Sequence, residues 1–166
     1  MTRWLTPLPR GIAFTDPAVT VATFGGAGLL RPAPGTWGSL AALFAGWPLA
    51  LFGGPVALSI AAVVAFLAGL WATERYCAAA GRVDPPEVVI DEVAAMWLVM
   101  AALPPTPLAY LLGFGFFRLF DIWKPWPIGF VERRVAGEMG VMADDVIAAV
   151  YAIIAAWVAG IVFFTV

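Results

Sequence analysis

The sequence predicts an all-α integral membrane protein, a bundle of about five hydrophobic helices of which some are short. Of its 166 residues, 63% are hydrophobic and only 12% are charged, and the mean hydropathy is +0.94. An average soluble domain has about 25% charged residues, and a small soluble domain cannot hide this much apolar surface in its core. Lipid is therefore expected to surround much of the chain, which forms a single domain over residues 1–166.

Five uncharged apolar segments, each bounded by glycine, proline or charged residues, are the expected helices. They are Gly38–Phe52, Pro55–Trp71, Val93–Leu103, Leu108–Phe120 and Val146–Val166. The last is long enough to cross a bilayer of about 30 Å, the second is nearly as long, and the other three look short. Residues 17–30 fit either an interfacial helix or a re-entrant segment.

The charged residues are confined to residues 1–37, 74–92 and 118–145, which together hold all 9 basic and 11 acidic residues. Tight uncharged joints, Gly-Gly at 53–54 and Pro-Pro-Thr-Pro at 104–107, connect the first helix to the second and the third to the fourth. If each pair is a hairpin, the three charged segments emerge at one face of the membrane. Lys and Arg mark the cytoplasmic side, so this face is expected to be cytoplasmic, with the C-terminus opposite.

The composition also limits the chemistry. The chain has no histidine and one cysteine, Cys77, which excludes histidine-dependent triads, histidine zinc sites and an internal disulfide. A net charge of −2 without a long basic run argues against nucleic-acid binding. Carboxylates and a few cations remain. Oxygen ligands select Mg²⁺, Ca²⁺ or Mn²⁺, and Mg²⁺ usually accompanies phosphate substrates.

Two acidic pairs, Asp91-Glu92 and Asp144-Asp145, stand beside the starts of expected helices. The helix dipole favours acidic residues there, so capping explains part of the pattern but does not require two adjacent pairs. Brought together, the pairs could hold one or two metal ions. If the segment after the two prolines is helical, Glu87 and Asp91 share one face at a spacing of four residues.

Two further groups of residues suit an anion. The segment Gly-Thr-Trp-Gly-Ser at 35–39 opens the first long helix, where Thr36 or Ser39 can cap the helix and exposed amides can bind an anion. Capping alone is the commoner use of such residues. A phosphate role for this segment therefore needs support from elsewhere in the chain.

Arg118, Asp121 and Lys124 follow one another at spacings of three residues near the end of the fourth expected helix. Ionisable residues at membrane depth are energetically costly, so those that are present usually serve a function. These residues are therefore candidates for the site. Trp123 and Trp126 suit the lipid–water interface.

Four motifs occur in order: GAGLLRPAPGTWGSL at 26–40, VVIDE at 88–92, FRLFDIWKPWPI at 117–128 and GVMADD at 140–145. Together they closely resemble the phosphatidylglycerophosphatase A family, from about residue 20 to residue 150. The resemblance implies a small helical inner-membrane phosphatase of phospholipid biosynthesis. It implies Mg²⁺-dependent removal of the terminal phosphate from phosphatidylglycerophosphate to give phosphatidylglycerol.

The resemblance also assigns roles to residues. The expected catalytic carboxylates are Asp84, Asp91, Glu92, Asp121, Asp144 and Asp145. The expected substrate-binding side chains are Thr36, Ser39, Arg118, Lys124 and Arg133. The expected Mg²⁺ ligands, at the cytoplasmic interface, are Asp91, Glu92, Asp144 and Asp145. The chain departs from the family pattern at Ala95, where relatives often have glycine, and at Glu138, which replaces one glycine of a frequent pair.

Several alternatives stay open. The nucleophile is either water or an aspartate, and the protein could act on another lipid phosphate, such as phosphatidic acid, or be a lipid-linked phosphotransferase. A small transporter would carry charges at mid-membrane, whereas the centres of the five apolar segments are uncharged. The expected partner is a phospholipid substrate in the membrane, and the oligomeric state is left open.

Overall fold

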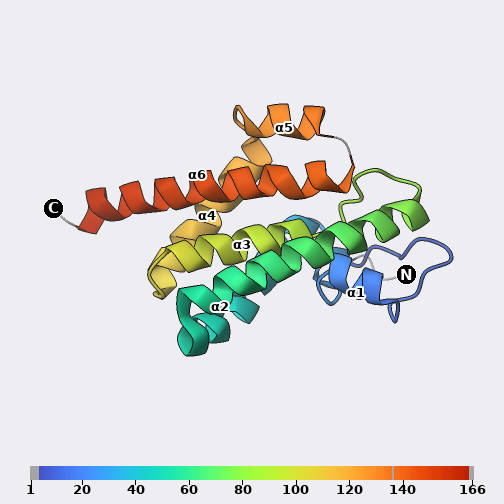
Figure 1. Ribbon diagram of the computed structural model, residues 1–166, viewed down its shortest axis with the longest axis horizontal. Coiled ribbons are helices and arrows are strands. Elements are labelled where there is room, and N and C mark those ends of the chain that lie inside the picture. Colours follow the sequence, from blue (N-terminus) through green and yellow to red (C-terminus); the bar gives the residue numbers. More distant parts are fainter. Residues whose placement is uncertain (1–3, 136, 165–166) are drawn as a thin grey trace.

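The computed structural model describes residues 4–135 and 137–164, and every regular element in this part of the chain is helical (Figure 1). The side chains of residues 132, 133, 138 and 161–164 are outside the description. The elements in chain order are α1 (Pro17–Ala22), the 3₁₀ helix η1 (Ala27–Leu29), α2 (Pro34–Ala80), α3 (Ile90–Ala102), α4 (Pro107–Trp123), α5 (Ile128–Arg134) and α6 (Glu138–Phe164). The all-α prediction is confirmed for the described residues.

The first two expected helices are the two arms of α2. Gly54 separates them with a non-helical backbone at φ 62° and ψ −162°, a region that essentially only glycine adopts. Pro55 follows directly and cannot supply the N–H that a continuous helix would need. The predicted joint at 53–54 is therefore present, between a first arm of residues 34–53 and a second arm of residues 55–80.

The two arms run in opposite directions beside α3. In the first arm, Gly38 lies against Val89 just before α3, and Gly46 lies against Met100 near its end. In the second arm the order is reversed, because Gly69 lies against Ile90 at the start of α3. Hence α2 is a hairpin whose two ends lie at the level where α3 begins, as predicted from the tight uncharged joint.

The proline-rich joint connects α3 to α4 as expected. Thr106 caps α4, its hydroxyl accepting a hydrogen bond from the Ala109 amide at 3.2 Å, and Pro107 occupies the first turn, where its missing N–H is harmless. α3 is packed against α2, α4 and α6, and most of its side chains are buried. This 13-residue helix is thus the centre of the bundle.

Residues 17–30, which the sequence left ambiguous, form the short helix α1 and then η1. Asp16 caps α1 by accepting from the Ala18 amide at 2.8 Å. The carbonyl of Ala22 accepts from the amide of Val89 at 2.9 Å. The segment therefore packs against the main bundle and holds the backbone that leads into α3.

Three helix starts differ from the prediction by three residues or more: α2 begins at Pro34 rather than Gly38, and the other two starts lie at the acidic pairs. α3 begins at Ile90 and α6 at Glu138, so both acidic pairs lie inside helices rather than before them. The predicted helices were drawn from uncharged apolar runs, so they left out the first turns of α3 and α6, which contain charged residues. A charged residue is nevertheless tolerated in a helix when it faces a polar cavity. The helix α5 was not predicted, since its seven residues hold no long apolar run.

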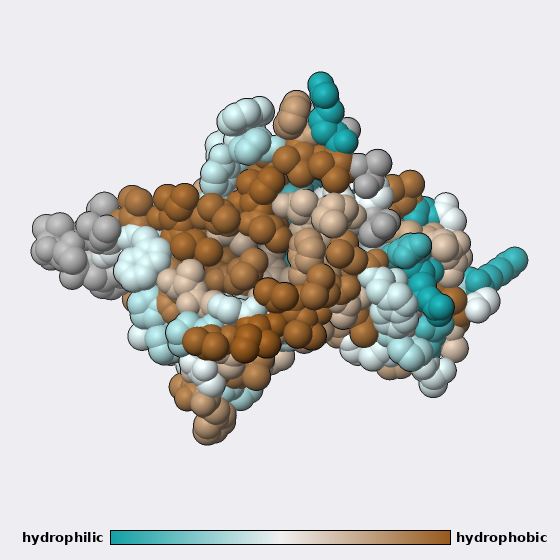
Figure 2. Space-filling model, in the orientation of Figure 1, coloured by the Kyte–Doolittle hydropathy of each residue, from teal (hydrophilic) through white to brown (hydrophobic). Residues whose placement is uncertain are grey.

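By length and composition, two stretches of the described residues could cross a membrane: α2 and the part of α6 from Met139 to Gly160. On the face shown in Figure 2, hydrophobic side chains cover much of both segments, and Leu67 and Ile154, for example, are exposed. The most hydrophilic residues gather at the end of the molecule near α1 and around α5. This separation supports membrane association, and α3 is too short to count as a crossing.

Candidate active site

A cavity of about 620 Å³ lies at the end of the bundle where α2, α3 and α6 begin and α4 ends. The loop at 83–88 closes one side, and residues 135–141 contribute to another. Nine residues assigned to the site from the sequence line this cavity: Thr36, Asp84, Asp91, Glu92, Arg118, Asp121, Lys124, Asp144 and Asp145. Helix ends from opposite halves of the sequence thus bring together acidic and basic residues at one polar hollow.

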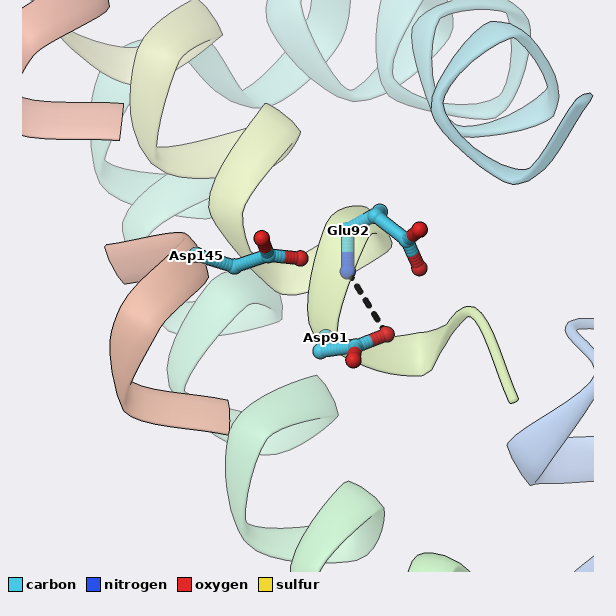
Figure 3. A group of neighbouring side chains, drawn as sticks. All are labelled: Asp91, Glu92 and Asp145. Carbon is cyan, nitrogen blue, oxygen red and sulfur yellow. Dashed lines mark hydrogen bonds between the residues drawn. The ribbon is translucent and has the colours of Figure 1, made fainter. Parts of the chain in front are cut away.

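Three carboxylates form a compact group inside the cavity. Asp91, Glu92 and Asp145 each offer an oxygen, and these oxygens lie within 4.8 Å of one another. Figure 3 shows Asp145 reaching from α6 toward the start of α3, where the other two residues stand. The Glu92 amide donates to Asp91 Oδ1 at 3.0 Å, whereas Glu92 Oε2 is buried without a hydrogen-bond partner among the described atoms.

The electrostatics of this group favour a bound cation. Burial raises the pKa of Asp91 well above its usual value, and the nearby Glu92 carboxylate raises it further. Burial likewise raises the pKa of Glu92, against the lowering effects of Asp91 and Arg118. Buried carboxylates that repel one another are stabilised as anions by a metal ion. Three oxygen donors and no nitrogen or sulfur fit Mg²⁺.

Asp144, predicted as a metal ligand, is not part of this compact group. Its Oδ2 accepts a hydrogen bond from Lys124 Nζ at 2.8 Å, and its Oδ1 accepts from the Asp145 amide at 3.0 Å. Adjacent residues on a helix point about 100° apart, so Asp145 faces the other carboxylates while Asp144 faces the end of α4.

Lys124 is the C-terminal cap of α4 and adopts the left-handed conformation, with φ 47° and ψ 56°. Glycine or asparagine usually occupies such a position. The lysine is held there by its ion pair with Asp144 and by a hydrogen bond from its amide to the Phe120 carbonyl at 2.8 Å. This conformation directs the ammonium group of Lys124 toward the cavity, close to the three carboxylates.

Arg118 lies between two carboxylates and a hydroxyl. Its Nη1 is 2.7 Å from Asp121 Oδ2, 3.6 Å from Glu92 Oε1 and 3.4 Å from Ser39 Oγ. The Arg118 Nε is buried without a partner among the described atoms. The guanidinium is therefore fixed in place at the wall of the cavity, with its Nη1 next to Asp121 and Glu92.

Ser39 does not line the cavity, contrary to its predicted role in binding substrate directly. It is fully buried and donates to the Gly35 carbonyl at 2.8 Å. The expected cap by Thr36 or Ser39 is also wrong, because α2 begins after Ala33 with no side-chain cap. The Ser39 hydroxyl instead lies behind Arg118.

Gly35 was predicted only as part of the segment 35–39 and was given no role of its own. A Cβ added there would collide with Glu92 Oε1 and lie 3.1 Å from both terminal nitrogens of Arg118. Only a residue without a side chain lets the start of α2 approach this ion pair so closely. A glycine one residue after the start of a helix was the available signal, but it does not by itself identify a partner 57 residues away.

Two further predicted positions need comment. Glu87 does not share a helix face with Asp91, because the chain before α3 is not helical; it forms an ion pair with Arg82 at 2.9 Å instead. Arg133 is in α5, and its side chain lies outside the described residues. Trp123 and Trp126 are exposed, as residues of a lipid interface would be.

Comparisons of the amino-acid sequence with known families and proteins give the following matches. The family model described as phosphatidylglycerophosphatase A matches residues 20–160. Phosphatidylglycerophosphatase A of Haemophilus influenzae is 38% identical over 149 residues, covering 89% of this chain and 91% of the relative. The protein of the same name from Escherichia coli is 34% identical over 154 residues, covering 92% and 86%.

A third relative, a putative phosphatidylinositol-3-phosphatase of Bacteroides thetaiotaomicron, is 37% identical over 153 residues, covering 86% of this chain and 95% of the relative. No solved structure gives a significant match. The family match covers α2, α3 and α4 and all but the last four residues of α6, and the two relatives named phosphatidylglycerophosphatase A each match about nine tenths of the chain. This chain therefore belongs to the phosphatidylglycerophosphatase A family and is a phosphatase.

Proposed function

We propose that the protein hydrolyses phosphatidylglycerophosphate to phosphatidylglycerol and inorganic phosphate, with Mg²⁺, at the cytoplasmic face of a bacterial inner membrane. The observation that carries this proposal is the adjacency of a buried carboxylate group, which suits a metal ion, to Arg118 and Lys124, which suit a phosphate. The names of two relatives supply the lipid, and all three relatives are bacterial.

Asp91, Glu92 and Asp145 are the proposed Mg²⁺ ligands. The buried Glu92 oxygen without a partner is the feature that a cation would satisfy. When bound, Mg²⁺ would offset the negative charge of the phosphate and make a water molecule more acidic. Asp144 belongs instead to the phosphate side of the site, where it orients Lys124.

The residues of the chain bind the substrate and move protons. Arg118 and Lys124 hold the phosphate oxygens, and the Asp121 and Glu92 carboxylates keep the guanidinium of Arg118 oriented. Water attacks phosphorus, and the bond from phosphorus to the glycerol oxygen breaks. A cavity carboxylate accepts the proton of the water, and the departing oxygen is protonated to give the alcohol. Attack by an aspartate, followed by hydrolysis, is the alternative route.

The direction of the helices supports the following membrane arrangement, which is part of the proposal. The two arms of α2 and the helix α6 cross the bilayer, and α3 and α4 form a shorter hairpin against them. The cavity then lies where a lipid headgroup lies, and the charged segments favour the cytoplasmic side.

The test is phosphate release from phosphatidylglycerophosphate by the purified protein in detergent, with Mg²⁺ and with EDTA. Asp145→Asn should abolish release because it removes the negative charge of one of the three carboxylates. Glu74→Gln is the matched control, since Glu74 is exposed on α2 away from the cavity lining. Release that persists in EDTA would refute the metal role, and full activity of Asp145→Asn would remove this residue from the site.

A second candidate is the hydrolysis of another lipid phosphate. It is favoured by the Bacteroides relative, whose name refers to a phosphorylated inositol lipid. Phosphatidic acid and phosphatidylinositol 3-phosphate, assayed beside phosphatidylglycerophosphate, separate the two candidates by their kcat/KM values. A phosphotransferase would consume the lipid without releasing inorganic phosphate.

A further inference from the structure

A second hollow, apart from the polar cavity, lies on the apolar flank of the bundle. It has a volume of about 310 Å³ and is lined by Ser59 of α2, Leu98 and Ala102 of α3, and Val146, Ala149 and Val150 of α6, among others. α6 and the second arm of α2 form its walls, and α3 forms its floor. This is the face seen in Figure 2, where hydrophobic side chains cover both walls.

Contacts between helices bound this groove along the bundle, and its long side, where Ser59 and Val150 are exposed, is open toward the surroundings of the protein. Toward the polar cavity, Met142 of α6 lies against Gly69 of α2. At the far end, Trp157 Nε1 donates to the Ala102 carbonyl at 3.1 Å and joins α6 to the end of α3. Between these closures, the small residues Ala102 and Ala149 and the exposed Ser59 leave the walls apart.

The groove continues the helix faces that carry the metal-binding carboxylates. Ala149 follows Asp145 by four residues on α6, and Leu98 follows Asp91 by seven residues on α3. Residues at these spacings share one face of a helix. At 1.5 Å per residue, Ala149 lies about 6 Å and Leu98 about 10 Å from these carboxylates along the helix axes, and Val146, which also lines the groove, follows Asp145 directly.

This separation suits a lipid whose phosphate lies in the polar cavity. The headgroup of a phospholipid is joined to two acyl chains, and the groove offers one of them a slot on the membrane side of the same helices. Transfer of an acyl chain from lipid into this slot gains little hydrophobic free energy, because lipid tails are as apolar as leucine side chains. Its effect is orientation, which fixes the depth and direction of the phosphate before reaction.

We propose that the groove between α2, α3 and α6 binds one acyl chain of the phospholipid substrate and thereby sets the position of its phosphate at the carboxylates. This inference rests on the proposed function, since it assumes a lipid phosphate in the polar cavity. The two acyl chains of the substrate would then lie in different places, one held by the protein and one left in the bilayer.

The test fills the groove from each wall. Val150→Trp places an indole over the groove from α6, and Val158→Trp is its matched control, because the two valines are 49% and 54% exposed and Val158 is not in the lining. Ser59→Phe fills the opposite wall, with the exposed Ile60→Phe as control. All four positions are at the surface, so the variants should fold.

Phosphate release is measured from phosphatidylglycerophosphate with two oleoyl chains and with two hexanoyl chains. Val150→Trp and Ser59→Phe should lower kcat/KM for the long-chain lipid by about tenfold or more while changing the short-chain value little. Both controls should resemble the unchanged protein. Equal losses on both lipids, or no loss on either, would overturn the proposal.

A photo-crosslinking measurement separates this inference from the proposed function. A long-chain phosphatidylglycerophosphate with a diazirine in one acyl chain should label residues 146–153, and phosphatidylcholine with the same chain should label them less. Equal labelling by both lipids would mean that bulk lipid fills the groove, which overturns the proposal. If no lipid phosphate is hydrolysed, the proposed function fails, and the labelling alone decides the role of the groove.

Discussion

Lys124 Nζ and Asp144 Oδ2 lie 2.8 Å apart, which pairs a residue predicted to bind phosphate with one predicted to bind metal. The pair joins the end of α4 to the second turn of α6 at the edge of the cavity. A carboxylate that already neutralises a lysine is a weaker metal ligand than one without such a partner. The pair therefore supports the proposed division of the acidic residues of the cavity, in which Asp91, Glu92 and Asp145 bind the metal and Asp144 orients the lysine that binds phosphate.

Asp144→Asn should consequently raise KM for the lipid phosphate, by about tenfold, while leaving Mg²⁺ activation in place. The reason is that the variant removes the ion pair between Asp144 and Lys124 but keeps the three carboxylates that are proposed to bind Mg²⁺. Steady-state kinetics at varied substrate and varied Mg²⁺ distinguish the two effects. Because both residues act through one pair, Lys124→Ala combined with Asp144→Asn should be little worse than Lys124→Ala alone. If the Mg²⁺ concentration needed for activity shifted as strongly as the KM, Asp144 would instead be a metal ligand.

Gly35→Ala should reduce activity strongly without preventing membrane insertion. The added methyl group would meet Glu92 Oε1 and the terminal nitrogens of Arg118, so the guanidinium and the carboxylate must move. Gly115→Ala is the matched control, because a Cβ there has no neighbour within 4 Å and alanine favours a helix by about 1 kcal/mol over glycine. Phosphate release from equal amounts of folded protein checks this, and equal activities of the two variants would contradict it.

The sequence predicted the general layout because that layout depends on composition. Charges avoid lipid, so their confinement to three segments indicated one polar end, and Gly-Gly and proline joints indicated the hairpins. The acidic residues Asp91, Glu92 and Asp145 do meet at that end. Their roles as metal ligands stay predictions, as does the role of Arg133.

Details that depend on helix rotation could not be predicted. The segregation of charge places Asp144 and Asp145 near the cavity but does not say which one faces α3 and which faces Lys124. The same limit applies to Ser39, whose hydroxyl lies behind Arg118 rather than in the cavity. The close approach of Gly35 to Glu92 depends on how two distant helix ends pack, which no local pattern encodes.

Arg118→Lys should lower kcat/KM by about a hundredfold. Arginine contacts Glu92, Asp121 and Ser39 from one nitrogen, and its planar fork of donors suits the proposed phosphate as well, whereas lysine offers a single point charge on a flexible stem. Arg75→Lys, at an exposed position over the ring of Trp71, should leave kinetics unchanged. Near-normal kcat/KM in Arg118→Lys would show that charge alone suffices at this position.

Mg²⁺ should raise the thermal stability of the detergent-solubilised protein, and Asp91→Asn should remove most of that increase. A cation that binds only the folded state stabilises it by about 2.7 kcal/mol at a hundred times its Kd, and it relieves repulsion among the buried carboxylates. Thermal unfolding with Mg²⁺ and with EDTA measures the shift, and Glu74→Gln should retain it. An identical shift in Asp91→Asn would place the ion elsewhere.

Gly54→Ala should destabilise the protein by about 1–3 kcal/mol, the range for a residue forced into a sparsely populated backbone region. Gly54 has φ 62° and ψ −162° at the turn between the two arms of α2, and its side-chain position meets no neighbour within 4 Å. Any loss must therefore come from the backbone, since a methyl group there would not clash. Gly160→Ala, also without a neighbour within 4 Å, should cause no loss in the same unfolding measurement. If Gly54→Ala were as stable as this control, the hairpin of α2 would not depend on a left-handed residue at its turn.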